Sequence, residues 1–218
     1  MPDDARATVL AAVRGAIEGV RDADPDATYA AIARGYRSGG ADGSEPLRRF
    51  TERLEEYGVA VRRVAAAELP AAVAEWAQLR GVRRWVVPAG VPEAWLARLD
   101  GVQRVADDAA PDVLDAADAV VTACAVAVAE TGTIALDAGP GQGRRAATLV
   151  PDAHLCVVRA SQVVDGVPEA VARLHAAVVE GRPITFVSGP SATSDIELVR
   201  VAGVHGPRTL AVVLVDDA

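Results

Sequence analysis

From Pro46 to the end of the chain, segments with helical periodicity alternate with short apolar runs typical of buried strands. Helices are expected at residues 46–57, 68–79, 92–99, 167–179 and 195–201, and strands at 59–64, 85–87, 102–105, 119–129, 133–136, 155–158, 184–187 and 210–215. Repeated alternation of this kind predicts an α/β fold of three layers, in which helices cover a mostly parallel sheet.

Two of the expected strands are joined too closely for a wholly parallel sheet. The apolar runs 119–129 and 133–136 are separated only by Glu130, Thr131 and Gly132. A parallel crossover needs a dozen or more residues, so a tight turn or bulge must join these strands. The sheet is therefore expected to be mixed.

The first 44 residues have a different character from the rest. Val9, Val13 and Ile17 recur at four-residue spacing, which predicts a short amphipathic helix over residues 4–20. Residues 21–44 are rich in Asp, Gly, Ala and Ser and are expected to form a mobile linker with a turn of helix near residues 29–33. We therefore divide the chain into residues 1–44 and an α/β domain of residues 45–218. One hypothesis is that the first helix docks on a neighbouring subunit or a partner.

The overall charge and hydropathy exclude several classes of protein. The net charge is −8 and the pI is near 4.9, without a cluster of basic residues, which argues against a nucleic-acid partner. The amino terminus lacks the basic start and apolar core of a secretory signal. The most apolar run, residues 119–129, is about half as long as the ~20 residues of a membrane span. We expect a cytoplasmic protein without a membrane span.

The two cysteines, Cys124 and Cys156, lie in separate apolar runs and form no Cys-x-x-Cys pair. We expect both to be buried, reduced thiols. An iron–sulfur cluster normally takes four thiolates, so this chain is not expected to hold one, and we expect no cofactor in it.

Residues 184–207 combine an apolar strand, a Gly-Pro-Ser turn, a capped helix and a second Gly-rich turn. Loops at the carboxyl ends of strands in open α/β sheets commonly bind ligands. Ser194 and Glu197 have the spacing of a capping box, and helix capping alone would explain them. The hydroxyls around the turn exceed what one cap requires, so we expect an anion pocket with the candidate ligand-binding residues Ser188, Gly189, Ser191, Thr193, Ser194 and Asp195.

Two motifs resemble those of a known family. Residues 188–197, SGPSATSDIE, followed by Gly203-Val204-His205-Gly206-Pro207, resemble the carboxyl-terminal signature of the LUD-domain family, the lactate utilisation protein C group. Residues 129–134, AETGTI, resemble its Ala-Glu-Thr-Gly-Thr motif, and an arginine, Arg144 or Arg145, precedes residues 149–154 as in the family. Ala192 departs from the pattern, because many members are expected to carry an arginine there.

This resemblance implies both a fold and a function. The LUD family is similar to the NagB/RpiA/CoA-transferase-like fold. The resemblance implies a component of an L-lactate utilisation system, which oxidises L-lactate to pyruvate. The partners would be proteins that carry iron–sulfur clusters, and the ligand a small carboxylate or phosphate.

Glu130 and His205 are the candidate catalytic residues. Glu130 ends an apolar strand beside Thr131, Gly132 and Thr133, where burial would favour its protonated form and suit it to acid–base or nucleophilic work. A solvated turn glutamate is the alternative. His205 lies on a loop and could act as a general base or donate a hydrogen bond to a carboxylate. No second histidine stands at ligand spacing, so no metal site is expected.

Arg144 and Arg145 follow a Gly-rich loop whose spacing differs from the Gly-x-Gly-x-x-Gly nucleotide motif. A guanidinium can hold a carboxylate or phosphate with two hydrogen bonds, so these arginines are the expected anion ligands, although at least one could be a solvated surface residue. We expect one pocket that combines Glu130, these arginines, the turn at Ser188 and His205, with Thr131, Gly132 and Thr133 as further candidate ligand-binding residues. Two alternatives stay open: a stand-alone transferase or isomerase that uses Glu130 on coenzyme A thioesters or sugar phosphates, and a ligand-binding subunit without catalysis.

Overall fold

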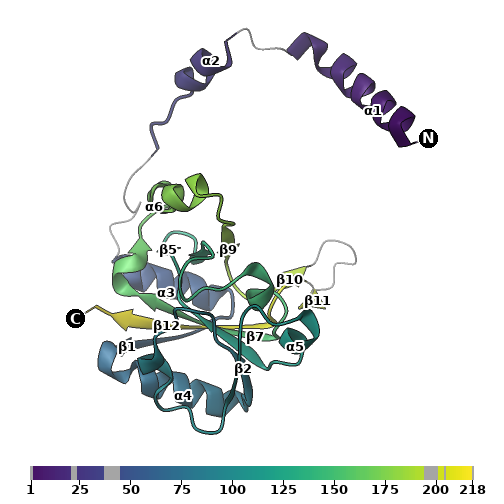
Figure 1. Cartoon of the computed structure of the whole chain (residues 1–218). Helices are drawn as coiled ribbons and strands as arrows, with labels where there is room; N and C mark the ends of the chain where they lie inside the picture. Colours follow the sequence, from purple (N-terminus) through teal and green to yellow (C-terminus); the bar gives the residue numbers. More distant parts are fainter. Residues whose placement is uncertain (1, 21–23, 37–44, 194–200, 204, 218) are drawn as a thin grey trace. The chain divides into compact units, whose positions relative to one another are not determined.

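The computed structural model describes residues 2–20, 24–36, 45–193, 201–203 and 205–217 (Figure 1). The chain divides into two units, Met1–Tyr36 and Arg37–Ala218. Each unit is described by itself.

The first unit contains two helices and little burial. Helix α1 (Pro2–Ile17) confirms the expected first helix and continues into the 3-10 helix η1 (Glu18–Val20). Helix α2 (Pro25–Ala31) begins at Asp24, whose carboxylate accepts a hydrogen bond from the Ala27 N–H at 2.9 Å. Val9 and Ile17 of α1 remain 61% and 51% exposed, and none of the α2 residues is buried. The apolar stripe of α1 therefore has no cover within this unit's described residues.

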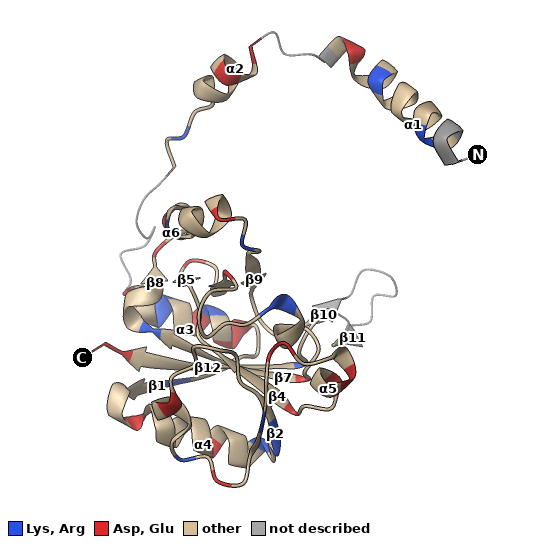
Figure 2. Ribbon diagram, viewed as in Figure 1, with Lys and Arg blue, Asp and Glu red and all other residues tan. Residues whose placement is uncertain are grey.

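The second unit is built on a six-stranded, wholly parallel sheet in the order β1-β12-β7-β4-β2-β3. Its strands are β1 (Ala60–Ala65), β2 (Arg84–Val86), β3 (Gln103–Val105), β4 (Ala119–Thr122), β7 (Ala153–Arg159) and β12 (Thr209–Asp216). In Figure 2, β4, β7 and β12 are tan over most of their length, as expected for strands covered on both faces.

The antiparallel pairings lie in a second sheet of four strands, in the order β8-β5-β6-β9. Its strands are β5 (Val126–Val128), β6 (Thr133–Leu136), β8 (Val163–Val164) and β9 (Thr185–Val187). Strands β5 and β6 pair antiparallel, which confirms the tight turn expected at residues 130–132. The run 119–129, expected as one strand, passes from one sheet to the other, because the Ala123 N–H donates to the Gly141 carbonyl at 2.8 Å and the Ala125 N–H to the Ala135 carbonyl at 2.9 Å.

Helices and the second sheet cover the two faces of the parallel sheet (Figure 1). Helix α4 (Leu69–Arg80) and the 3-10 helix η3 (Glu93–Leu96) cover one face, and α3 (Pro46–Glu56) and the second sheet cover the other. Helix α6 (Val167–Val179) packs on the outer face of the second sheet. Alternate residues of β12 face the two cores, with Ala211, Val213 and Val215 toward α4 and Leu210, Val212 and Leu214 toward the second sheet.

Several short elements were not expected from the sequence. The helix expected at residues 92–99 is only the four-residue η3. The unexpected elements are α5 (Pro111–Asp115), the 3-10 helices η2 (Ala66–Glu68), η4 (Arg145–Thr148) and η5 (Ala160–Gln162), strand β8, and the paired strands β10 (Ala192–Thr193) and β11 (Val201–Ala202). Elements of two to five residues are too short to show a periodic pattern. The helix expected at residues 195–201 lies outside the described residues, except for Val201, which belongs to β11.

The mixed α/β architecture with a mostly parallel sheet is confirmed, and its likeness to the NagB/RpiA/CoA-transferase-like fold stays a prediction. Among the helices that the structure describes, none combines the length and apolar character needed to cross a bilayer.

Candidate functional site

A pocket of about 270 Å³ lies at the amino-terminal ends of β7 and β12, beside the carboxyl end of β9. Its described walls come from η4, β7, β9, β12 and the loops 188–191 and 205–207. The pocket therefore lies at the carboxyl end of β9 in the second sheet, as expected for a ligand site. In the parallel sheet, by contrast, it lies at the amino ends of the strands and not at their carboxyl ends.

The two loops that border the pocket are tied to each other through Ser191. The Ser191 N–H donates to the Pro207 carbonyl at 2.9 Å, and the Gly203 N–H donates to the Ser191 carbonyl at 3.0 Å. The Ser191 hydroxyl accepts a hydrogen bond from the His205 N–H at 3.0 Å. These bonds hold the Ser188 turn and the His205 loop on one side of the pocket.

Arg145 is the one arginine among the described lining residues, and it is held only loosely. Its guanidinium donates to the Thr148 hydroxyl at 3.3 Å and to the His205 carbonyl at 3.4 Å, both long for hydrogen bonds. Partial burial lowers the pKa of Arg145, but a guanidinium keeps its charge at neutral pH. Since a guanidinium has five N–H donors, Arg145 retains donors for a ligand.

His154 is one of two buried polar residues in the described lining, and Thr148 is the other. His154 lies on β7 with only 2% of its surface exposed, and its Nε2 is hydrogen-bonded to the Thr122 hydroxyl of β4 at 2.7 Å. Burial, and secondarily the charge of Arg145, lower the pKa of His154 to about 4. The ring is therefore neutral at neutral pH.

The described lining of the pocket contains basic and hydroxyl side chains and lacks carboxylates. Its described residues include Arg145, two histidines and several hydroxyls, but no Asp or Glu. A concave site without carboxylates, in a chain whose net charge is −8, is a local departure from the general negative field.

Five of the residues singled out from the sequence border this pocket: Arg145, Ser188, Gly189, Ser191 and His205. Two more approach it through a chain of hydroxyls. The Thr131 and Thr133 hydroxyls are 2.7 Å apart, and the Thr133 hydroxyl is 2.7 Å from that of Ser188. The structure therefore brings the Thr-Gly-Thr turn to the rim of the pocket.

Glu130 does not lie where we expected it. Its side chain is exposed and is not among the described lining residues, and its N–H donates to the Asp165 carbonyl at 3.0 Å. Gly132, at φ +61°, places the turn against α3, where an added Cβ would lie 2.8 Å from the Cβ of Arg53. The expected burial of Glu130 in a shared pocket is therefore wrong, because the turn packs on a helix, and its catalytic role stays an untested prediction.

Arg144 is separated from its neighbour. Its Nε donates to the Asp107 carbonyl at 2.7 Å, a second guanidinium nitrogen donates to the Ala109 carbonyl, and its backbone N–H donates to the Asp107 carboxylate at 3.3 Å. Arg144 thus anchors the loop after β3, and the expectation that it lines the same pocket as Arg145 is wrong. The side chain of Thr193 and all of Ser194 and Asp195 lie outside the described residues.

Sequence analysis missed four polar residues at or behind the pocket, namely Thr122, Thr148, His154 and Thr185. A usable signal was present: His154 and Thr122 are polar residues at the ends of two apolar strands. Their pairing depends on the adjacency of β4 and β7, which are not neighbours in sequence.

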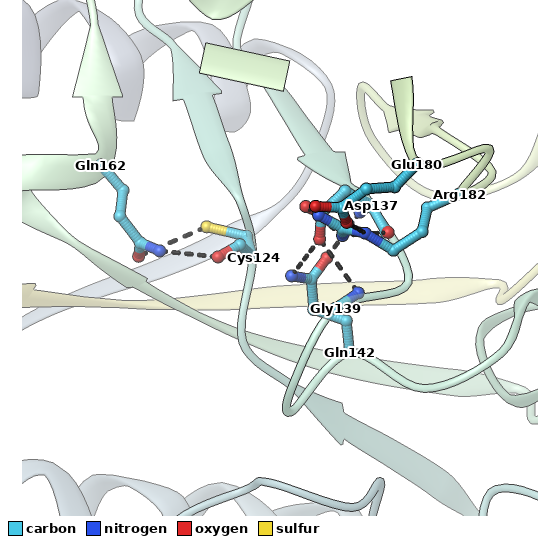
Figure 3. Close-up of polar contacts among 7 residues, drawn as sticks. All are labelled: Cys124, Asp137, Gly139, Gln142, Gln162, Glu180 and Arg182. Carbon is cyan, nitrogen blue, oxygen red and sulfur yellow. Dashed lines mark hydrogen bonds and ion pairs between the residues drawn. The ribbon is translucent and has the colours of Figure 1, made fainter. Parts of the chain in front are cut away.

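Other polar clusters lie away from the pocket. Figure 3 shows Asp137 with Gly139, Gln142 and Arg182, and Cys124 with Gln162. Cys124 and Cys156 are buried and free, as expected, and a hydrogen bond with Cys156 and burial raise the pKa of Cys124. Across the described ranges, no group of three or more His, Cys, Asp or Glu residues is placed to hold a metal ion.

The fold and site together define an α/β protein with two stacked sheets and a pocket at the amino ends of its central strands. The LUD domain family model matches residues 47–215. The chain belongs to the LUD-domain family.

Individual relatives agree with this assignment. Lactate utilization protein C of Deinococcus radiodurans is 54% identical over 172 residues, which are 79% of this chain and 80% of that protein. Lactate utilization protein C of Geobacillus sp. strain WCH70 is 33% identical over 110 residues, 49% of this chain and 45% of that protein. The crystal structure of a DUF162 family protein from Deinococcus radiodurans has a TM-score of 0.68 and 47% identity, and the match covers 78% of this chain and 96% of that chain.

Proposed function

We propose that this chain acts in lactate utilisation, as a cytoplasmic component of the system that oxidises L-lactate to pyruvate. The observation that carries the proposal is the 54% identity, over most of both chains, with a protein named Lactate utilization protein C. The AETGTI and SGPSATSDIE motifs both lie inside the matched domain, residues 47–215.

The chain would act with partner proteins that carry iron–sulfur clusters. Lactate oxidation releases two electrons, which need an acceptor. This chain has only two cysteines, both buried, whereas a cluster normally takes four thiolates. The electron carriers are therefore assigned to partners and not to this chain.

The pocket would bind a small anionic ligand, a carboxylate or a phosphate. Arg145 supplies a positive charge with spare donors, and the described lining has no carboxylate to repel an anion. The alternative of a stand-alone transferase or isomerase acting through Glu130 has less support, because Glu130 lies outside this lining.

The proposal is tested by deleting the gene in the native organism and measuring growth on L-lactate and on pyruvate. We expect growth on L-lactate to fail and growth on pyruvate to continue, with recovery when the wild-type chain or Glu130→Gln is supplied. Tagged protein from lactate-grown cells should co-purify with cysteine-rich iron–sulfur proteins in a fixed ratio. Normal growth of the deletion strain on L-lactate would contradict the proposal, and failure of Glu130→Gln alone would favour the Glu130 enzyme.

A further inference from the structure

Three hydroxyls form a hydrogen-bonded chain from the turn at residues 130–132 to the pocket. The Thr131 and Thr133 oxygens are 2.7 Å apart, and the Thr133 and Ser188 oxygens are also 2.7 Å apart. Ser188 lines the pocket, whereas the two threonines are not among its described lining residues. The chain of hydroxyls therefore links a sequence motif outside the lining to a residue that belongs to it.

The backbone fixes the positions of these hydroxyls. Strands β6 and β9 pair antiparallel, and their register places Thr133 opposite Ser188, one step beyond the paired residues. Gly132, at φ +61°, separates the two threonines, and its turn packs on α3, where an added Cβ would lie 2.8 Å from the Cβ of Arg53. The spacing of the three oxygens is therefore set by strand pairing and by a closely packed turn.

The direction of the hydrogen bonds in this chain depends on what the pocket holds. Each hydroxyl has one proton to donate and lone pairs that accept, and either oxygen of each pair can be the donor. An anionic oxygen only accepts, so a hydrogen bond between Ser188 and an anion uses the Ser188 proton. Ser188 then accepts from Thr133, and Thr133 accepts from Thr131.

We propose that Thr133 is a positioning residue for the anion pocket, and that Thr131 supports it. When an anion is bound, each threonine donates to the next oxygen, so that all three protons point along the chain toward the pocket. Each hydrogen bond polarises the next one, and the aligned chain strengthens the bond from Ser188 to the anion. This inference rests on the anion pocket of the proposed function, and it assigns to the AETGTI motif a role that does not involve the carboxylate of Glu130.

The test measures anion binding to the full-length protein at pH 7 by NMR titration of its backbone amide signals, with inorganic phosphate and L-lactate as the probes. Arg145→Gln should weaken the tighter-binding probe about tenfold or more, which places that probe in this pocket. Ser188→Ala should also weaken it about tenfold or more, and Thr133→Val about threefold to tenfold, because Ser188 loses the bond that aligns its proton. Thr131→Val, one step further from the pocket, should weaken it less than about threefold.

Matched variants separate positioning from a general effect on the fold. Thr133→Ser keeps the hydroxyl and should bind the probe within about twofold of wild type. Thr51→Val is the control, because the Thr51 hydroxyl donates to the Leu47 carbonyl within α3 at 3.0 Å, and it should leave binding unchanged. In the Ser188→Ala background, Thr133→Val should have no further effect, because Thr133 acts on the anion only through Ser188.

The outcomes distinguish this inference from the proposed function. Equal losses from Thr133→Val in the wild-type and Ser188→Ala backgrounds overturn the positioning role, and so does weak binding by Thr133→Ser. Binding of neither probe, or binding that Arg145→Gln leaves unchanged, overturns the anion pocket and this inference with it, whereas the growth experiment still decides the role in lactate utilisation. If Thr133→Val does not fold, as judged by circular dichroism, Thr133→Ala takes its place in the same comparison.

Discussion

The two ends of the parallel sheet differ in their hydrogen bonding. At the amino ends of β7 and β12, polar groups remain available for a ligand, whereas at the carboxyl ends of β2 and β4 most polar groups are hydrogen-bonded within the protein. In the pocket, Arg145 makes only long hydrogen bonds. At the other end, the Gly-rich loop is hydrogen-bonded to its neighbours, because the Gly141 N–H donates to the Ala89 carbonyl and the Gly141 carbonyl accepts from the Ala123 N–H, both at 2.8 Å.

Asp137 completes the second region. Its carboxylate accepts from the Gly139 N–H at 3.0 Å and from Gln142 Nε2 at 2.7 Å, and it pairs with Arg182 at 2.6 Å (Figure 3). Burial would raise the pKa of Asp137, but the hydrogen bonds from Arg182, Gly139 and Gln142 outweigh burial and hold that pKa below its ordinary value. A saturated network of this kind stabilises the fold, and the unsaturated pocket is the region suited to bind a ligand.

The largest effect is expected where the Gly-rich loop contacts the sheet. At Gly90, with φ +89°, an added Cβ would lie 2.8 Å from the Gly141 backbone nitrogen. Gly90→Ala should lower the free energy of unfolding by about 2–5 kcal/mol, from overpacking and left-handed strain together. Gly81→Ala is the control, because Gly81 has φ +66° and open space around it, and should cost about 1 kcal/mol. Urea unfolding measures both, and equal losses would refute close packing at Gly90.

The burial of His154 should make the free energy of unfolding depend on pH. The pKa of His154 is about 4 in the folded protein, against an ordinary value of 6.5, so between these values the unfolded chain binds a proton that the folded chain does not. Stability is therefore complete above pH 6.5 and falls as pH drops toward 4, by roughly 3 kcal/mol from this group. Wild type should lose that much more stability than His154→Gln between pH 7 and 4. If the free energy of unfolding changed equally with pH in the two proteins, His154 would not be buried in its neutral form.

Gln142 tests the saturated network directly. Its side chain, 5% exposed, accepts from the Asp137 N–H at 2.7 Å and donates to the Asp137 carboxylate. Gln142→Ala should cost about 1–3 kcal/mol because it leaves buried partners unsatisfied. The exposed Gln78→Ala on α4 should change stability by less than about 0.5 kcal/mol. Thermal melts of the two variants would coincide if the loop did not depend on this contact.

The adjacent arginines should differ in their effect on stability. Arg144 bonds two backbone carbonyls in a solvent-exposed setting, so Arg144→Gln should cost about 1 kcal/mol. Arg145 makes only long bonds, so Arg145→Gln should change the free energy of unfolding by less than about 0.5 kcal/mol while weakening anion binding. Chemical denaturation of both variants checks this, and the reverse order of losses would contradict the assignment.

Deletion of residues 1–44 should have the smallest effect on stability. The apolar residues of α1 are exposed within their unit, so the remaining domain should keep its melting temperature. If α1 docks on a neighbouring subunit or a partner, the deletion should change the oligomeric state or partner binding, as measured by light scattering and co-purification. A truncated protein that is unchanged in both respects would reject the docking hypothesis.

Much of the candidate site was accessible from sequence because its residues cluster along the chain. Ser188, Gly189, Ser191 and His205 were found because turn residues and hydroxyls gather there for no evident capping reason. The predicted position of Glu130 was wrong. The direction in which its turn faces depends on packing against α3, which is distant in sequence.

The sequence by itself determined most of the longer helices and strands and the tight turn between β5 and β6, since periodicity, glycine stops and short connections act locally. Only the tertiary structure decided that β5 and β6 leave the parallel sheet, that Arg144 and Arg145 separate, and that Thr122 meets His154. The order of strands in a sheet is set by the burial of whole faces against each other, and that free energy is shared among residues far apart in the chain.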